Sequence, residues 1–553
     1  MSPGPGEHRG AGERRGPVRR RRMLKDNLGV ASGTLASRVT GVVRILALNS
    51  AMAVSLRDVY LLANNTPNIV YELILGGILT ATLVPLFTDH LEHADDTATD
   101  AVVSVAGIAL AAITVVGAVV APLLMLLYSS NIGRGVDPAV FRRVGIELSL
   151  LFAPQIFFYG AMAIGSALLN ARGRYLAAAW TPVLNNVVVI AVLLGVGAAY
   201  DAPGVGDASS NRSLLLLLGL GTTSGIIGMA VALLPALRRA GVRVRFRPDL
   251  HHPAVRRAVT LSGWTIGYVI ANQVAAQVVN VLAKPGSGGV TYYQTAFMFF
   301  QLPHGLLAVT LMTTLQPDMA RAHSRRDREA FADRLLLGLR LLLLVIVPAA
   351  AGALILSPAV LHAHGAAATL RARPWVVPVG DTLAAFAPGL IGFSVYLFVL
   401  RGFYARKDTR TPFFLNCVEN VLNIVFALIL VRPFGVRGLA AAYAIAYTAA
   451  AALAGTALIR RTRGFRLDLL RATATRVVAS AAAMAFLAFA LGRAIGAEGE
   501  DRLLVAVAAV TVAGVATYGA AIWAFDVPRG LGLFGRGPIG PPPPAGPPPA
   551  LRK

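Results

Sequence analysis

The 553-residue sequence has a single cysteine, few lysines and few charged residues of any kind. The lone Cys417 excludes an internal disulfide and a metal cluster built from cysteines. Lysines occur at Lys25, Lys284, Lys407 and Lys553, and none of them completes a GxxxxGK[ST] phosphate-binding loop, so we do not expect a nucleotide-driven pump. Charged residues make up 14% of the chain, against roughly 25% in ordinary soluble domains, which excludes a typical soluble protein.

Patterns of catalytic groups are also lacking. The histidines lie mostly in expected loops and do not share a helical register with carboxylates, so the sequence predicts no metal site. A nucleophile paired with a base is not visible either. We therefore expect neither an enzyme nor a bound cofactor.

Long apolar runs dominate the chain. Hydrophobic residues make up 56% of it, the mean hydropathy is +0.64, and the apolar runs are about 20 residues long, enough to cross a membrane as helices. The net charge of +24 comes from basic residues in short breaks between these runs, so the expected partner is a lipid surface and not nucleic acid. The sequence predicts an all-α polytopic membrane protein.

About fourteen segments are long enough to span a hydrocarbon core. The second is unusual because it is long and holds Pro67, so we expect that element to tilt or break. The predicted spans are 27–48, 57–88, 101–128, 143–169, 176–199, 213–236, 258–282, 291–316, 335–357, 381–402, 412–431, 438–459, 474–492 and 503–525.

The basic residues also predict the orientation and the domains. With the N-terminus in the cytoplasm, most lysines and arginines fall on cytoplasmic segments, and an even number of spans returns the C-terminus to that side. The predicted parts are a disordered basic tail (1–26), an N-lobe of six spans (27–236), a basic cytoplasmic linker (237–257), a C-lobe of six spans (258–459), two further spans (460–525) and a Pro-rich cytoplasmic tail (526–553).

A weak internal repeat appears at an offset of about 230 residues. The segment 171–186 resembles 405–423, since each has an Arg-containing turn, then Thr-Pro, then asparagines. Pro67 and Pro85 correspond in the same way to Pro303 and Pro317. The paired segments lie six spans apart, which is an even number, so we expect two lobes of parallel topology.

Ionisable residues inside a span mark candidate functional sites because each costs roughly 2.5 to 3.5 kcal/mol to insert. Arg38 lies at the centre of the first predicted span, and Arg44 lies nearer its outer end, where its side chain could reach the interface. Glu72, near the middle of the second span, is the natural counter-charge to Arg38. A purely structural salt bridge between Arg38 and Glu72 is the alternative to a ligand site.

Amides and a carboxylate also lie within two later spans. Asn272, Gln273, Gln277 and Asn280 lie in span 258–282, and Asn416, Glu419, Asn420 and Asn423 lie in span 412–431. For most of these residues we predict hydrogen bonds between helices.

Several of these residues together resemble the SRxxGxxR…D…PN…G…VP signature of the MurJ (MviN) lipid II flippases, a family of the multidrug/oligosaccharidyl-lipid/polysaccharide exporter superfamily. The resemblance covers about 30–525, and the inner loops at 170–175 and 403–412 also resemble those of the family. The matching residues are Ser37, Arg38, Gly41, Arg44, Asp58, Pro67, Asn68, Gly77, Val84 and Pro85.

The resemblance implies two six-helix lobes around a cationic central cavity, with a groove along the last two helices for a polyprenyl tail. It implies transport of lipid II, the undecaprenyl-diphosphate-linked precursor of peptidoglycan, from the inner to the outer leaflet. Ser37, Arg38, Arg44, Asp58 and Asn68 match cavity positions, and Glu72 adds an anion. The chain departs from the family pattern at three positions, where it has Tyr71, Gly76 and Met298.

Three other functions remain open. A translocase of another polyprenyl-linked glycan would share the cationic cavity. A drug/cation antiporter of the same superfamily would have twelve spans and an acidic, aromatic site. A scaffold that recruits cell-wall synthesis or division proteins through its tails would tolerate neutral replacement of Arg38. In each case we expect a multi-pass protein of the bacterial cytoplasmic membrane with both termini inside the cell.

Overall fold

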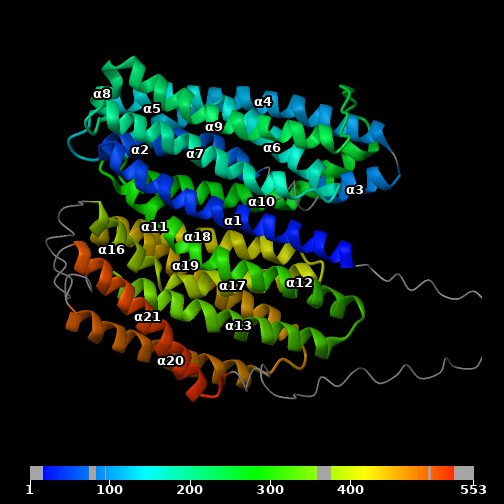
Figure 1. Ribbon diagram of the computed structural model, residues 1–553, viewed down its shortest axis with the longest axis vertical. Helices are drawn as coiled ribbons and strands as arrows, with labels where there is room; N and C mark the ends of the chain where they lie inside the picture. The colour runs from blue at the N-terminus through cyan, green and yellow to red at the C-terminus, as the bar shows by residue number, and fades with distance from the viewer. Residues whose placement is uncertain (1–16, 74–82, 94, 358–374, 496–499, 528–553) are drawn as a thin grey trace, which may run out of the picture. The chain divides into compact units, whose positions relative to one another are not determined.

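The described part of the chain is helical and divides into two compact units, Met1–Val269 and Ile270–Lys553 (Figure 1). The computed structural model describes residues 17–73, 83–93, 95–357, 375–495 and 500–527. Within these ranges the side chains of 17–28, 70–73, 256–266, 500–501 and 503–504 are not described.

Unit 1 consists of long helices joined by short connections. They are α1 (Pro17–Ala51), α2 (Val54–Leu73), α3 (Val84–Glu92), α4 (Asp96–Tyr128), α5 (Pro138–Phe152), α6 (Pro154–Ala171), α7 (Leu176–Ala199), the short α8 (Val205–Ser210), α9 (Arg212–Arg239) and the first part of α10 (Pro253–Leu282). Aspartate or asparagine side chains cap the beginnings of α4, α5 and α9, which explains why these helices begin where they do.

Unit 2 begins within α10 and has the same character. Its other helices are α11 (Gly289–Pro303), the π-helical turn η3 (His304–Ala308), α12 (Val309–Ser324), α13 (Arg328–Ile355), α16 (Val376–Phe386), α17 (Gly389–Ala405), α18 (Arg410–Phe434), α19 (Val436–Arg460), α20 (Leu467–Ile495) and α21 (Glu500–Ala524).

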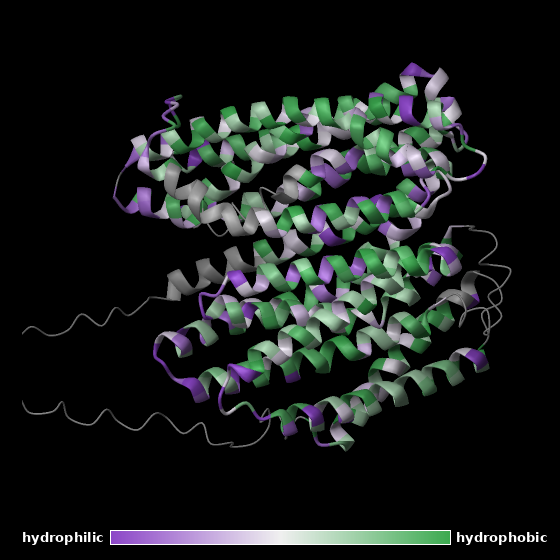
Figure 2. Cartoon of the chain, turned by 180° about the vertical axis from the view of Figure 1, so that it is seen from behind, coloured by the Kyte–Doolittle hydropathy of each residue, from purple (hydrophilic) through white to green (hydrophobic). Residues whose placement is uncertain are grey.

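The hydropathy of these helices suits a membrane. Hydrophobic residues cover most of the helical length, and hydrophilic residues gather at helix ends and in connections (Figure 2). Large apolar side chains remain exposed, among them Val115, Val119 and Leu123 of α4 at 64%, 68% and 63%. Contiguous exposed apolar surface of this kind is a liability in water and the normal state of a helix in lipid.

Length and hydropathy identify fewer membrane spans among the described helices than the sequence pattern predicts. Ten helices of the described chain are long and apolar enough to cross a membrane, or eleven if the bent pair α16 and α17 is one span. The predicted spans that correspond to α1, α2 and α10 are not among them. The polytopic, all-helical class is confirmed for the described residues, and the count of fourteen stays a prediction.

Prolines interrupt several predicted spans, but Pro67 does not. The predicted span 143–169 divides at Pro154 into α5 and α6, and the predicted span 381–402 divides next to Pro388 into α16 and α17, which are bent by 50°. Pro303 precedes the π-helical turn in the predicted span 291–316. α2 stays helical across Pro67 and ends at Leu73, and the next described helix begins at Val84.

The two turns that the predicted repeat pairs have the same backbone conformation. The turn at 169–174 between α6 and α7 and the turn at 403–408 between α17 and α18 share a hydrogen-bond pattern, in which the last amide bonds to the first carbonyl over 2.9 Å and 3.0 Å. The fifth residue of each turn has positive φ, +68° at Gly173 and +60° at Lys407. The same pattern also follows α9 at 237–242 and α12 at 322–327, so it is a common way to end a helix. The predicted internal repeat stays a prediction.

The basic connection between α9 and α10 is held against the start of α4. The Arg245 amide donates to Asp100 Oδ1 over 2.9 Å, and the Arg247 amide donates to Ser104 Oγ over 2.8 Å. Asp100 lies in an acidic stretch that departs from the basic character predicted for the inner connections. The structure supplies a reason, since this carboxylate binds the backbone of the arginine-rich connection.

In unit 2, α17 packs directly on the backbone of α19. A Cβ atom added at Gly389 would lie 2.5 Å from Ala444 Cα, and one added at Gly392 would lie 2.6 Å from Thr448 Cα. Small residues that allow two backbones to approach are a general device for packing helices in membranes, where apolar side chains gain little by leaving lipid.

We expect Gly392→Ala to destabilise the protein by about 1 to 3 kcal/mol, because the added methyl group meets backbone that cannot turn aside. Gly352→Ala in α13 is the matched control, since its added Cβ meets nothing within 4 Å. Thermal unfolding in detergent would measure both. Equal melting temperatures for the two variants would contradict the backbone contact.

Candidate functional site

The segment of α1 around Ser37 and Arg38 is fixed by a buried asparagine of α7. Asn186 Nδ2 donates to the Ser37 carbonyl over 3.1 Å and to Thr40 Oγ1 over 3.0 Å. Thr40 Oγ1 in turn donates to the Ala36 carbonyl over 2.8 Å. These bonds bracket Arg38, so α7 sets the position from which its side chain extends.

The two arginines of α1 differ in their surroundings. Arg38 is exposed and, among the described residues, no carboxylate forms an ion pair with it. Arg44 is half-buried and lies within electrostatic range of the buried Tyr60 in α2. The Glu72 side chain lies outside the described part of the chain, so the structure leaves the predicted pair between Arg38 and Glu72 untested.

The start of α2 is a buried polar region. Asp58 is fully buried, and the neighbouring Arg57 is 4% exposed. Arg57 Nη1 donates to both the backbone carbonyl and the side-chain oxygen of Asn49 at the end of α1, over 3.0 Å and 2.8 Å. Because Asp58 is enclosed, a ligand cannot touch it in this structure.

Further along α2, polar side chains join neighbouring helices. The Tyr60 hydroxyl lies 2.8 Å from Thr222 Oγ1 of α9, and Asn65 Nδ2 donates to the Tyr128 hydroxyl of α4 over 3.3 Å. Asn68, which the sequence placed in the cavity, is half-buried. Part of the polar stretch of α2 therefore holds unit 1 together.

Unit 2 has its own buried polar cluster between α10 and α18. Asn272 Oδ1 accepts hydrogen bonds from Asn416 Nδ2 and Asn420 Nδ2, each over 2.8 Å. Asn420 Nδ2 also donates to the Asn416 carbonyl over 2.8 Å. The prediction that these amides bond between helices is confirmed for these three residues.

Glu419 is a buried carboxylate that the sequence reasoning did not select for the site. It is 1% exposed, and neither carboxylate oxygen has a hydrogen-bond partner in the described part of the chain. The same holds for the side-chain oxygens of Asn416 and Asn423. The sequence did contain a signal for this site, namely an acidic residue inside an apolar run, three positions after Asn416.

The structure thus places the predicted residues on two helices of unit 1. Ser37, Arg38 and Arg44 lie on α1, whereas Asp58, Asn68 and Glu72 lie on α2. Their roles in binding stay predictions. A helical protein with polar and charged groups inside its spans is the arrangement expected of a membrane transporter.

Comparison with solved structures identifies the fold. A lipid II flippase MurJ in an inward closed conformation matches with a TM-score of 0.70 and 18% identity, covering 90% of this chain and 98% of that one. A multidrug resistance MATE family transporter of the MOP superfamily, in an inward-facing conformation, matches with a TM-score of 0.60 and 13% identity, covering 78% and 95%. The chain shares the helical fold of these two transporters.

Sequence comparison then gives the family. The family model for lipid II flippase MurJ matches residues 50–499, and the chain belongs to that family. A probable lipid II flippase MurJ from Vibrio cholerae serotype O1 is 27% identical over 440 residues, covering 76% of this chain and 80% of the relative. One from Rhizobium meliloti is 27% identical over 468 residues, covering 84% and 85%.

We expect Asn272→Ala to lower stability by about 1 to 2 kcal/mol, because it removes the acceptor shared by two buried amides. Val274→Ala is the control, since Val274 is 55% exposed on the same helix. Melting temperatures in detergent would separate the two variants. Equal losses would mean that the shared hydrogen bonds do not hold α10 to α18.

Proposed function

We propose that this protein translocates lipid II from the inner to the outer leaflet of the bacterial cytoplasmic membrane by alternating access. The observation that carries the proposal is the match to the lipid II flippase family over residues 50–499, which includes most of the described helices. The relatives from Vibrio cholerae and Rhizobium meliloti, each named a probable lipid II flippase, support the same substrate.

The physical requirement of this task agrees with the charge on α1. A diphosphate must cross a region of low dielectric, and an arginine offers a permanent charge and a planar pair of donors to its oxygens. Arg38 has these properties and an exposed side chain. We assign Ser37, Arg38, Arg44, Asn68 and Glu72 to the substrate site, with the enclosed Asp58 in a supporting position.

The direction of transport follows from charge and voltage. An inside-negative potential favours outward movement of an anion by about 2.3 kcal/mol per elementary charge for each 100 mV. The chain lacks a nucleotide-binding loop of the GxxxxGK[ST] type. We propose that the membrane potential, an ion gradient or consumption of lipid II outside the cell provides the driving force.

Two other transport functions are the alternatives. Another polyprenyl-linked glycan would need the same cationic side chains, and only a substrate assay separates it from lipid II. A drug/cation antiporter would be consistent with the fold of the MATE transporter but not with an exposed arginine at the centre of a span. The family match favours the lipid II flippase over both alternatives.

We further propose that both termini lie in the cytoplasm. The arginine-rich connection after α9 and the start of α4 lie at the same end of unit 1, because Asp100 and Ser104 bind that connection. The positive-inside rule assigns this end to the cytoplasm. Any proteins of cell-wall synthesis or division that bind the chain would meet the basic and Pro-rich tails there.

Labelling with an impermeant thiol reagent tests the orientation in a Cys417→Ser background. We expect Ser209→Cys in α8 to react in intact cells and Arg243→Cys, after α9, to react only after permeabilisation. Both positions are exposed, so access and not burial decides the result. Labelling of Arg243→Cys in intact cells would reverse the assignment and the direction of transport.

Replacement of Arg38 tests the substrate site. In cells depleted of their own lipid II flippase, we expect Arg38→Ala to insert and accumulate but to lose transport, measured as the lipid II exposed in the outer leaflet. Arg38→Lys should retain part of the activity, because an ammonium keeps the charge and loses the fork. Arg134→Ala, an exposed arginine in the connection after α4, is the control and should transport normally.

The double variant Arg38→Gln/Glu72→Gln separates binding from a structural salt bridge. If the two residues only neutralise each other, the single neutral variants should be unstable and the double variant should regain stability and transport. If Arg38 binds the diphosphate, the double variant should be stable and inactive. Native transport by the double variant would overturn the assignment of Arg38 to the substrate site.

A further inference from the structure

Glu419 lies near the middle of α18, on the face of that helix that is buried in unit 2. Asn416, Asn420 and Asn423 are buried on the same face at helical spacing. The carboxylate is 1% exposed, and in the described part of the chain neither of its oxygens has a hydrogen-bond partner. The side-chain oxygens of Asn416 and Asn423 also lack a donor there. This helix face therefore presents several buried acceptors that no described donor satisfies.

The charged residues of the surrounding helices lie elsewhere. On α18 itself, Arg410 and Arg432 are nine and thirteen positions from Glu419, which is about 13 Å and 20 Å along the helix. Arg437, at the start of α19, pairs with Asp381 over 3.5 Å. The described side chains of α10 carry no charge. A counter-charge for the carboxylate is thus missing from the described residues of these three helices.

The neighbouring helices α11 and α17 do not supply a counter-charge either. Tyr293 of α11 lies within electrostatic range of Glu419, but its phenol offers no positive charge. Arg401 of α17 donates to Gln316 of α12 over 3.3 Å. A rotated asparagine amide could donate a hydrogen bond to the carboxylate, but a neutral amide does not balance a full charge. An ionised Glu419 would therefore be a buried and uncompensated anion.

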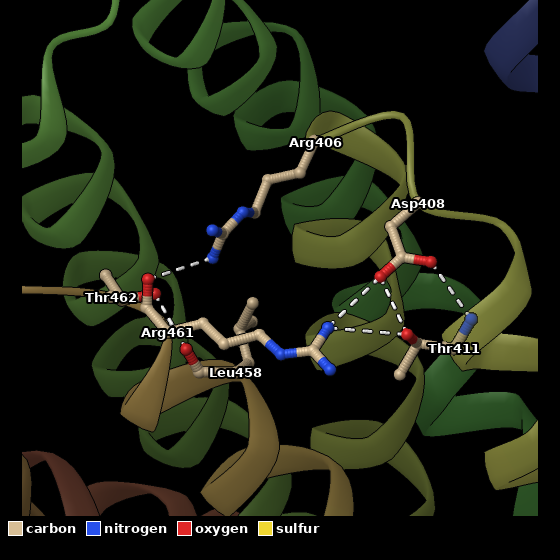
Figure 3. A network of polar contacts seen from close by, with 6 residues as sticks. All are labelled: Arg406, Asp408, Thr411, Leu458, Arg461 and Thr462. Carbon is tan, nitrogen blue, oxygen red and sulfur yellow. Dashed lines mark hydrogen bonds and ion pairs between the residues drawn. The ribbon is translucent and has the colours of Figure 1, made fainter.

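Asp408, which precedes α18, shows how the same unit holds an ionised carboxylate (Figure 3). One oxygen accepts from the Thr411 amide over 2.9 Å, and the other accepts from Thr411 Oγ1 over 2.7 Å and from Arg461 Nη1 over 3.3 Å. Partial burial opposes ionisation, but these hydrogen bonds and the charge of Arg461 outweigh it, so the pKa of Asp408 is lowered. Donors and a cation of this kind are what Glu419 lacks among the described residues.

We propose that Glu419 is a proton-binding site, neutral while α10 and α18 are packed together and ionised when they separate. A proton taken from water forms an O–H bond with one carboxylate oxygen, which removes the charge. It also turns one acceptor into a donor, and the amide oxygens of Asn416 and Asn423 are the acceptors one helical turn away. Three or more His, Cys, Asp or Glu side chains that could hold a metal ion do not come together in the described residues, which favours a proton.

The amides of α10 provide a polar route to this site. Asn272 Oδ1 accepts from Asn416 Nδ2 and Asn420 Nδ2, and Asn272 itself is half-buried. Further along α10, the half-buried Gln277 donates to Gln273 Oε1 over 3.5 Å. Polar side chains thus extend from the buried face of α18 to the accessible surface of α10. Separation of the two helices would admit water along them, and the proton would then leave to that water.

The role of the proton in transport rests on the proposed lipid II flippase function. We expect a proton to bind from the outer side and to be released to the cytoplasm in exchange for one lipid II anion. Both movements carry positive charge inward, so an inside-negative potential drives both. The existence of the proton site does not depend on which substrate is moved.

Infrared spectra of the purified full chain at neutral pH test the proton site directly. We expect a carbonyl band of a protonated carboxylic acid that is present in the wild type and absent in Glu419→Gln. Glu329→Gln is the matched control, because Glu329 is exposed at the start of α13 and should be ionised. Loss of the same band in the control, or no difference between the wild type and Glu419→Gln, would overturn the proposal.

Thermal unfolding provides a second measurement. Glutamine has the shape of the neutral acid, so Glu419→Gln should fold and melt like the wild type at acid pH. As the pH rises, the melting temperature of the wild type should fall more steeply, because its folded state holds a proton that the unfolded chain releases. Parallel pH profiles for the two proteins would contradict the proton site.

Transport in proteoliposomes tests the coupling, with the membrane potential held at zero by potassium and valinomycin. If one proton is exchanged for each lipid II, each unit of pH difference, acid outside, should change the leaflet ratio of lipid II about tenfold toward the outer leaflet. Glu419→Gln should lose this response, and Glu329→Gln should keep it. A wild type that moves no lipid II would refute the flippase proposal, and the infrared band would still decide the proton site.

Replacing choline with sodium in the infrared experiment separates a proton from a metal cation. We expect the band to be the same in both salts. A band that disappears in sodium would show that the carboxylate binds the metal ion and would overturn the choice of a proton. An unchanged pH response in Glu419→Gln proteoliposomes would overturn the coupling role.

Discussion

Each polar group that these helices carry into an apolar environment needs a partner inside the protein, and this constraint shapes both units. Water is not there to compensate a lost hydrogen bond, so an unpaired group costs more than it would at a wet surface. The Asn186 side chain finds its partners by joining α7 to α1, and the Asn272 side chain finds its partners by joining α10 to α18. In the described part of the chain, Arg38 is exposed without an ion pair and both carboxylate oxygens of Glu419 lack a hydrogen-bond partner, so structural packing assigns neither side chain a task.

The two units carry different side chains on turns of the same backbone conformation. The turns at 169–174 and 403–408 have the same hydrogen bonds, yet one presents Arg174 and the other Asp408 at the equivalent position.

The sequence predicted the helical class and the extent of most helices because apolar periodicity and length are local properties. The predicted span 176–199 coincides with α7 (Leu176–Ala199). It could not predict that α2 continues through Pro67, because neighbouring helices decide whether the freed backbone groups are accommodated.

The candidate site was less accessible to sequence reasoning. Arg38 stands out in any apolar run, but the enclosure of Asp58 depends on helices distant in the chain.

The contact between α17 and α19 has a mechanical consequence. Where Gly389 and Gly392 bring two backbones together, there are few side chains between the helices that could change rotamer and allow sliding. We therefore expect α17 and α19 to move together as one rigid pair. We expect unit 2 to bend where the helical hydrogen bonds are already interrupted. These places are the 50° bend between α16 and α17 and the π-helical turn after Pro303.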